Sequence, residues 1–399
     1  MSQFDEVIDR RGSGSVRWDS LLEKYGDEAV LPLTTADMGF RAPEAVREAL
    51  IRAAEFGIFG YTRPKQSYYE ALMERFQNKY HWPVRQEWIS YSPGIVGGVA
   101  FCIQGMTKPE DAVLLLTPMY HPFSHLIEDN GRRLISTKLL QNKTGAEIDF
   151  EQLEKDIAEH QVKMMIFCNP HNPIGRAWKE AEIREVCALC LQYKVLLVTD
   201  EIHADFVYEG HQFVSAGTVM EKLGGLNSLI VCSSGSKTYN IAGLQCSNVI
   251  IPDQELRKQY TAILQKQHYM ELNALGPVAA EAAYRYGEEW QQELLAYLQG
   301  NRDYLAAAVN ETIPGIHAIV PEATYMMWLD CRELGMTDAK LQEFLVKEAK
   351  LGLNPGNSFG PGGEGYVRIN FAEPRSVIEE AVRRLVSAVR KRQTEGRQV

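Results

Sequence analysis

The sequence predicts an α/β fold in which a mostly parallel sheet is covered by helices on both faces. Short apolar runs alternate with amphipathic stretches through the middle of the 399 residues, and this alternation is typical of parallel strands joined by helices. The length exceeds the ~250–300 residues at which a single core stops growing, which favours two domains. The last third changes to long helical patterns, which places a smaller domain there.

The candidate strands are short apolar runs. In chain order they are Ala112–Thr117, Arg133–Thr137, Met164–Cys168, Val195–Asp200, Leu229–Cys232 and Ser247–Ile251. Helical patterns such as Glu151–His160 and Lys179–Tyr193 lie between them. Because ligands bind beyond the carboxyl ends of the strands in such a sheet, residues directly after these runs are the first candidates for chemistry.

The last third predicts a smaller α+β domain. Its expected elements are helices Gln254–Glu271 and Ala279–Asn310, strand Tyr325–Asp330, helix Asp338–Ala349, a loop over Asn354–Gly365, strand Tyr366–Phe371 and helix Val377–Arg390. We therefore expect an N-terminal segment at 1–45 that packs with the small domain, a large domain at 46–285 and a small C-terminal domain at 286–399.

Composition narrows the function classes. The formal net charge of −10 argues against general binding to nucleic acid or to anionic membranes. No apolar run approaches the ~20 residues of a membrane span. The polar start, Met1–Trp18, lacks the apolar core of a signal peptide. We expect a cytoplasmic protein whose partners are small molecules.

The seven cysteines are scattered and lie mostly in apolar runs, as buried thiols in a reducing compartment do. Cys187 and Cys190 have the spacing of a redox or metal motif, but their surroundings, V-C-A-L-C-L, favour a packed amphipathic helix. We expect no metal site.

Two polar residues directly follow predicted strands. Lys237 stands in S-S-G-S-K-T-Y-N, a composition typical of a tight turn; taken alone, it could be an exposed surface lysine. Asp200 ends the run L-L-V-T-D, where a carboxylate can pair with a buried cation such as a protonated pyridine nitrogen. Alternatively, Asp200 could cap a following helix.

Other motifs add candidates. Asn172 lies in C-N-P-H-N-P-I-G-R, a defined turn, and Tyr120 follows a strand. The bend Tyr91–Val99 is glycine-rich and leads into Ala100–Gln104, so its backbone N–H groups could bind an anion. Arg368 sits among apolar neighbours in Y-V-R-I-N-F; a buried guanidinium needs an anionic partner, from ligand or protein.

The order and spacing of these motifs resemble the fold-type I pyridoxal 5′-phosphate (PLP) enzymes, the aspartate aminotransferase superfamily. The chain is most similar to the branch of cystathionine β-lyases and cysteine-S-conjugate β-lyases that includes MalY and PatB. The resemblance runs from about Phe4 to Arg390, and its most specific pieces are D-E-I-H, N-P-H-N-P-I-G-R, S-K-T-Y-N-I-A-G-L-Q and Y-H-P-F. It implies a seven-stranded large sheet and a homodimer with shared sites.

The resemblance also implies roles. Lys237 would carry PLP as a Schiff base, Asp200 would hold the pyridine nitrogen protonated, and Tyr120 and Ile202 would cover the two ring faces. His203 and Asn172 would lie near the 3′-oxygen, and Arg368, Asn172 and Ala36 would contact the substrate. The phosphate would be bound by Gly94, Ile95, Val96, Ser234 and Ser236, and by Tyr61 of a neighbouring subunit.

Two departures from the family pattern bear on these roles. Gly243-Leu244-Gln245 replaces the G-x-R of many aminotransferases, which favours a lyase. Gly39 stands in A-D-M-G-F where relatives often have a second aspartate, and we expect it to loosen the N-terminal segment. The predicted activity is β-elimination on S-substituted cysteines. An aminotransferase on the same scaffold and a non-catalytic regulatory role remain alternatives.

Overall fold

The computed structural model describes residues 2–395, and its central feature is a seven-stranded sheet. Its strands, in spatial order, are β2 (Ile89–Ser92), β10 (Ser247–Ile250), β9 (Leu229–Ser233), β8 (Leu196–Asp200), β7 (Met164–Cys168), β3 (Ala112–Thr117) and β4 (Arg133–Lys138). All run parallel except β10, which is antiparallel to both its neighbours. The predicted mostly parallel sheet is confirmed.

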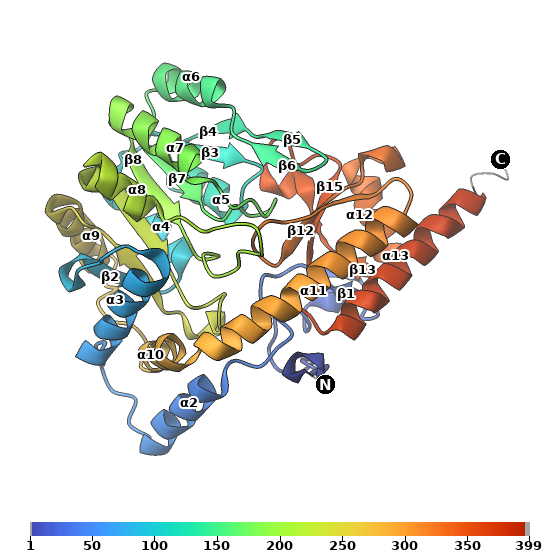
Figure 1. Ribbon diagram of the computed structural model, residues 1–399, viewed down its shortest axis with the longest axis horizontal. Coiled ribbons are helices and arrows are strands. Elements are labelled where there is room, and N and C mark those ends of the chain that lie inside the picture. Colours follow the sequence, from blue (N-terminus) through green and yellow to red (C-terminus); the bar gives the residue numbers. More distant parts are fainter. Residues whose placement is uncertain (1, 396–399) are drawn as a thin grey trace.

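Helices cover both faces of this sheet (Figure 1). One face carries α4 (Ile95–Met106), α5 (Pro122–Asp129) and α9 (Gln254–Lys266); the other carries α6 (Phe150–His160), α7 (Glu180–Tyr193) and α8 (Ala216–Leu223). Successive strand residues point to opposite faces, so Val113 and Leu115 join one buried cluster while Leu114 and Leu116 join the other. Burial on both faces explains why these strands read as continuous apolar runs.

A second, four-stranded antiparallel sheet forms in the last third of the chain. Its strands, in spatial order, are β11 (His317–Ile319), β12 (Met326–Asp330), β15 (Tyr366–Asn370) and β14 (Asn354–Pro355), with helices α11 (Glu288–Thr312), α12 (Asp338–Lys347) and α13 (Arg375–Glu395). Near the start of the chain, β1 (Leu31–Pro32) pairs with β13 (Leu351–Gly352). Figure 1 shows this pair next to α13, so an early segment is built into the late part of the fold.

The remaining elements are short or peripheral. They are α1 (Leu21–Tyr25), α2 (Glu44–Phe56), α3 (Gln66–Tyr80), α10 (Gly276–Tyr286), β5 (Leu140–Asn142), β6 (Gly145–Glu147), and the 3₁₀ helices η1 (Gln3–Asp5), η2 (Gln86–Trp88), η3 (Leu226–Ser228), η4 (Ala242–Leu244), η5 (Arg332–Leu334) and η6 (Gly356–Phe359). In residues 2–395, no helix combines the length and apolar character that crossing a bilayer requires.

The expected single helix Ala279–Asn310 is wrong. The structure has two helices, α10 and α11, separated at Gly287. A Cβ at Gly287 would come within 2.5 Å of the ring of Tyr239 and of the Ala283 carbonyl oxygen. The contact with Tyr239, 48 residues away in sequence, requires a glycine at position 287. The periodicity of a helix does not reveal such a contact, so the break between the two helices could not be predicted. The domain boundaries proposed from the sequence stay predictions.

Candidate active site

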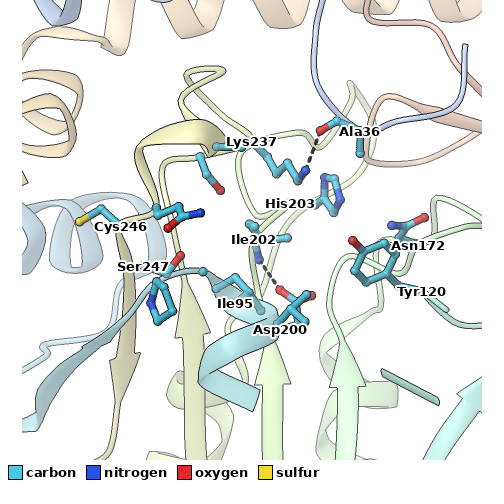
Figure 2. A pocket seen from close by; sticks show the side chains of 16 residues that line it. Ala36, Ile95, Tyr120, Asn172, Asp200, Ile202, His203, Lys237, Cys246 and Ser247 are labelled. Carbon is cyan, nitrogen blue, oxygen red and sulfur yellow. Dashed lines mark hydrogen bonds between the residues drawn. The ribbon is translucent and has the colours of Figure 1, made fainter. Parts of the chain in front are cut away.

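A cavity of about 160 Å³ lies at the carboxyl edge of the large sheet, where most of the predicted site residues converge. Those that line it are Ala36, Gly94, Ile95, Val96, Tyr120, Asn172, Asp200, Ile202, His203, Ser236 and Lys237. In Figure 2, Tyr120 and Asn172 lie together on one side of the cavity and Cys246 and Ser247 on the other. Residues from five separate strand ends and from the N-terminal segment thus line one cavity.

Lys237 lies on the turn after β9 and points into the cavity. The turn is fixed by Ser234, whose hydroxyl donates to the Cys246 carbonyl oxygen at 2.9 Å and accepts from the Ser236 N–H at 3.2 Å. Lys237 Nζ donates to the carbonyl oxygen of Ala36 at 2.6 Å. Burial lowers the pKa of Lys237 to about 8. The lysine is therefore a half-buried amine that loses its proton more readily than an ordinary lysine, and the alternative of an exposed surface lysine is wrong.

Asp200 closes β8 with its carboxylate buried at the cavity floor. Its Oδ1 accepts from the Ile202 N–H at 3.1 Å, and the residues that follow form a turn rather than a helix, so the alternative of a helix cap is not realised. Burial raises the pKa of Asp200 to about 7. A carboxyl group so desolvated would gain from a cation placed beside it.

Arg368 is buried in β15 directly behind Asn172. Its Nη1 donates to Asn172 Oδ1 at 2.9 Å, and its Nη2 donates to the Thr34 carbonyl oxygen and to Asn354 Oδ1, each at 2.8 Å. These acceptors are all neutral, and burial lowers the pKa of Arg368 to about 10. Its Nε has no hydrogen-bond partner in residues 2–395. The guanidinium therefore keeps an unused donor and no anionic partner, and it reaches the cavity lining through Asn172.

His203 and Tyr120 complete the polar wall. His203 is 2% exposed, and its Nδ1 has no hydrogen-bond partner within the described chain. Burial, with the charges of Lys237 and Arg368, lowers the pKa of His203 to about 3, so its ring is neutral. Burial raises the pKa of Tyr120, so its hydroxyl keeps its proton. Both side chains can serve as neutral hydrogen-bond donors.

The N-terminus of α4 faces the same cavity. The helix begins at Ile95, earlier than the bend Tyr91–Val99 suggested, with Gly94 as its N-cap. The first N–H groups of a helix have no partner within it. The N–H groups of Ile95 and Val96 are therefore available to an anion, and the dipole of the helix adds to the attraction.

Three predicted residues, Arg368, Ser234 and Tyr61, are not part of the cavity lining. Arg368 is buried next to Asn172, which does line the cavity. Ser234 is buried behind it, where it orders the Lys237 turn as described above. Tyr61 is 98% exposed and lines a separate hollow with Phe59 and Thr62. Within one chain, Tyr61 therefore does not contribute to the site.

Sequence reasoning missed several lining residues: Pro93, Ala242, Gln245, Cys246 and Ser247. Gln245 attracted notice only as a departure from the family pattern. Cys246 and Ser247 reach the site because β10 is antiparallel, so its beginning, and not its end, meets the carboxyl edge. The sequence does place Cys246 and Ser247 at the start of the apolar run of β10. That position indicates a site residue only when the strand is known to run antiparallel to its neighbours.

The Cys187/Cys190 pair lies in α7, with both side chains buried. Burial raises the pKa of Cys187 to about 12 and that of Cys190 further, which makes both poor ligands and poor nucleophiles. Among residues 2–395, no group of three or more His, Cys, Asp and Glu side chains could hold a metal ion.

The aminotransferase class I and II family matches residues 28–385. The chain belongs to this family. It is 39% identical to cystathionine beta-lyase PatB of Bacillus subtilis over 97% of this chain and 99% of that protein. Among family members of known structure, cystalysin from Treponema denticola, which contains PLP, superposes with a TM-score of 0.94 at 32% identity over 98% of this chain and 99% of that one.

A PLP-bound C–S lyase from Staphylococcus hominis gives a TM-score of 0.90 at 31% identity, and the match covers 98% of both chains. The predicted superfamily, its cystathionine β-lyase branch and its fold are thereby confirmed. The predicted carbon–sulfur β-lyase activity and PLP cofactor are supported by the same comparisons, whereas an aminotransferase such as the probable aspartate/prephenate aminotransferase of Aquifex aeolicus is only 23% identical.

Proposed function

We propose that this protein is a PLP-dependent carbon–sulfur β-lyase. It cleaves S-substituted L-cysteines such as cystathionine to a thiol, pyruvate and ammonia. The observation that carries the proposal is the meeting of Lys237, Asp200 and Asn172 in one cavity, in a chain that is 39% identical to a protein named cystathionine beta-lyase.

The cavity residues fit PLP. Lys237 offers a half-buried amine to the aldehyde, and Asp200 offers a desolvated carboxylate to the pyridine nitrogen. The unpartnered Nδ1 of His203 is available to the 3′-oxygen. The free N–H groups at the start of α4 suit a phosphate, with Ser236 beside them. Tyr120 and Ile202 are available to cover the two faces of the ring.

When bound, PLP supplies an electron sink that stabilises negative charge at the substrate α-carbon. Asp200 holds a proton on the pyridine nitrogen. Burial lowers the pKa of Lys237 to about 8, so a larger minority of its amine is neutral near pH 7 than for an ordinary lysine, and this neutral form removes the proton from the substrate α-carbon. Burial thus gives a larger share of the lysine the protonation state that a general base requires.

The remaining residues orient the substrate and assist departure of sulfur. Arg368 binds the α-carboxylate through its free donors, with Asn172 beside it. The C–S bond breaks with its electron pair on sulfur, and a thiol pKa near ~8.5 makes the thiolate a good leaving group. Tyr120, which keeps its proton, or the protonated Lys237 donates a proton to that sulfur.

The decisive experiment measures products. Purified protein with PLP and a panel of cysteine thioethers should release thiol and pyruvate in equal amounts without any added keto acid. Dependence on a keto acid, with no thiol released, would instead establish the aminotransferase alternative.

Lys237→Ala should lower turnover by at least ~10³-fold, because it removes both the cofactor link and a general base worth ~10²–10⁴-fold. Lys347→Ala is the matched control, since Lys347 is an exposed helix residue paired with Glu343. An active Lys237→Ala enzyme would remove Lys237 from the mechanism.

We also propose a homodimer whose sites are shared. Large apolar side chains are exposed around the segment after α2: Ile51, Phe56, Ile58, Phe59 and Tyr61 are 57–98% exposed. Isolated exposed apolar residues are common, but a run of this kind marks an interaction surface. A second copy of this chain covering that surface would bring Tyr61 to the phosphate end of a neighbouring cavity.

Mixing variants tests the sharing of sites. Lys237→Ala and Tyr61→Ala each impair every site in their own homodimers. A mixed dimer regains one site with both residues intact, so the mixture should show turnover that neither variant has alone. Sedimentation as a monomer, or no recovery after dissociation and mixing, would contradict the shared site.

A cytoplasmic location is part of the same proposal. All seven cysteines are free and buried, which suits a reducing compartment. Cell fractionation with an antibody to the protein tests this location directly.

A further inference from the structure

The carbonyl group of Ala36 fixes the direction of the Lys237 side chain. The Ala36 carbonyl oxygen accepts from Lys237 Nζ at 2.6 Å and from the Tyr325 hydroxyl at 2.9 Å. The residues after Ala36 are held through both backbone and side-chain contacts. Asn370 donates to the Asp37 carbonyl oxygen at 2.7 Å, and Asn240 donates to that of Met38 at 3.0 Å. Contacts that fix residues 36–40 therefore also fix the position of Lys237 Nζ, because this amine donates to the Ala36 carbonyl oxygen.

Arg17 joins this segment to the far end of the chain. Its side chain is fully buried and lies between two carboxylates: Asp37 Oδ1 at 3.2 Å from Nη1, and Glu373 Oε1 at 2.5 Å from Nη2. Its Nε donates to the Pro32 carbonyl oxygen at 2.7 Å. Arg10 pairs with the other oxygen of Asp37 at 2.5 Å. Two positive and two negative charges thus form one closed cluster behind the Ala36 carbonyl.

Gly39 makes room for Glu373. A Cβ at Gly39 would overlap Glu373 Oε2 and lie 2.8 Å from Glu373 Cδ. Gly39 is not among the glycines with positive φ, so the backbone there would accept other residues and the requirement is one of space alone. The expectation that Gly39 loosens the segment is not supported, because the missing side chain is replaced by a buried carboxylate from residue 373.

We infer that Glu373 is a positioning residue for Lys237, acting through Arg17 and residues 36–40, and that the absence of a side chain at Gly39 leaves the space that the Glu373 carboxylate occupies. The inference rests on the proposed role of Lys237 as the reactive amine. Glu373 is not among the residues that line the cavity. Its effect is to hold the carbonyl group that receives the amine.

The test is a double-substitution cycle at the two positions. Gly39→Asp adds a carboxylate in space already filled by Glu373, so it should raise the rate of PLP loss from the holoenzyme by about fivefold or more. Glu373→Ala removes a partner of Arg17 and should do the same. The double variant Gly39→Asp/Glu373→Ala places one carboxylate in the vacated space, and its rate should return to within about twofold of the parent, since neighbouring residues are not additive.

Further measurements separate positioning from a general loss of structure. The rate at which acetic anhydride labels Lys237 in the full chain without PLP, followed by mass spectrometry, should rise in both single variants and fall back in the double variant. Neither this rate nor the rate of PLP loss needs lyase turnover, so the inference can fail while the proposed function stands, and the reverse. Glu373→Gln keeps the shape and removes the charge; labelling as fast as in Glu373→Ala would assign the effect to the ion pair with Arg17.

Asp330→Ala is the matched control. Asp330 is a largely buried carboxylate in β12 of the four-stranded sheet, and it accepts hydrogen bonds from Arg332. Glu373 follows β15 of that sheet. Asp330→Ala should lower the melting temperature without changing the labelling rate of Lys237. Purely additive losses in the double variant, or unchanged labelling in Glu373→Ala, would overturn the inference. If Gly39→Asp fails to fold and the double variant folds, the result supports the proposal that the Glu373 carboxylate occupies the space beside Gly39. If neither variant folds, the labelling rate of Lys237 in Glu373→Ala tests the inference.

Discussion

Buried charges near Lys237 occur in two contrasting settings. In the cluster behind the Lys237 turn, Arg75 forms an ion pair with Asp205 and donates to the Tyr239 hydroxyl at 3.0 Å, while Thr238 donates to Asp205 at 2.5 Å. There the partners outweigh burial, so the pKa of Arg75 is raised and that of Asp205 is lowered. Each charge in this cluster is compensated within the protein.

In the cavity and its wall, burial prevails instead. The pKa of Asp200 is raised to about 7, that of Lys237 is lowered to about 8, and that of Arg368 is lowered to about 10. All three shifts favour the neutral form. Groups that lack compensation in the folded chain are arranged to receive it from a ligand, here a cation beside Asp200 and an anion at Arg368. The same degree of burial is therefore structural in one region and functional in the other.

Asp205→Ala should produce the largest effect. It leaves the Arg75 guanidinium buried without a carboxylate, which costs about 3–5 kcal/mol of stability. Denaturant unfolding measures this loss. Since Thr238 adjoins Lys237, we also expect weaker binding of PLP. A loss of stability below about 1 kcal/mol would show that Arg75 does not need the Asp205 carboxylate. It would contradict the distinction between this compensated cluster and the uncompensated groups of the cavity.

Asp200→Asn tests the cavity through pH. The pKa of Asp200 in the folded protein, about 7, exceeds its ordinary value of 3.8, so the folded state binds the extra proton between these values. Stability from this group is therefore full below pH ~4 and is lost as the pH rises through 7, by roughly 4 kcal/mol. Unfolding of the PLP-free protein should show this decline.

The Asp200→Asn variant should lose that slope while keeping the part due to Glu201, whose pKa is also raised to about 7 by burial. Glu201→Gln is the matched control. Bound PLP should abolish the Asp200 contribution, because a cation beside the carboxylate favours its charged form. An equal slope with and without PLP would argue against a cation there.

Arg368→Ala should have the smallest effect on stability and a selective effect on binding. It removes a desolvated charge whose acceptors are neutral, so unfolding should change far less than in Asp205→Ala. The KM for substrate should rise about 10- to 150-fold, as expected for a hydrogen bond to a charged group worth ~1.5–3 kcal/mol. Steady-state kinetics with two thioethers of different S-substituent should show the same rise for both. An unchanged KM would return Arg368 to a structural role.

The strand ends of the large sheet could be predicted from the sequence because parallel strands buried on both faces give uninterrupted apolar runs. Asp200 and Lys237 follow such runs directly, and the fold brings them to one edge. Cys246 and Ser247 were missed because the composition of β10 does not indicate whether the strand runs parallel or antiparallel to its neighbours. The pairing of Arg75 with Asp205, 130 residues apart, depends on tertiary packing that no local pattern records.

The contact between Gly39 and Glu373 also depends on tertiary packing, so the sequence could not predict it. A glycine in an irregular segment indicates freedom of the backbone, and a lone glutamate after a strand indicates solvent. Only their contact, across the length of the chain, reveals that one occupies the place of the other.

The pairing of β1 with β13, and of Asn370 with the Thr35 and Asp37 carbonyl oxygens, sets an order of events at the ribosome. Chains begin to fold from their N-terminal end during synthesis, yet several partners of the first forty residues here lie near the other end of the chain. The large sheet can assemble while the nascent chain is still growing, whereas Lys237 receives its final surroundings only after β15 has left the exit tunnel. Competence to accept the cofactor in its final geometry is thus acquired after translation of nearly the whole chain.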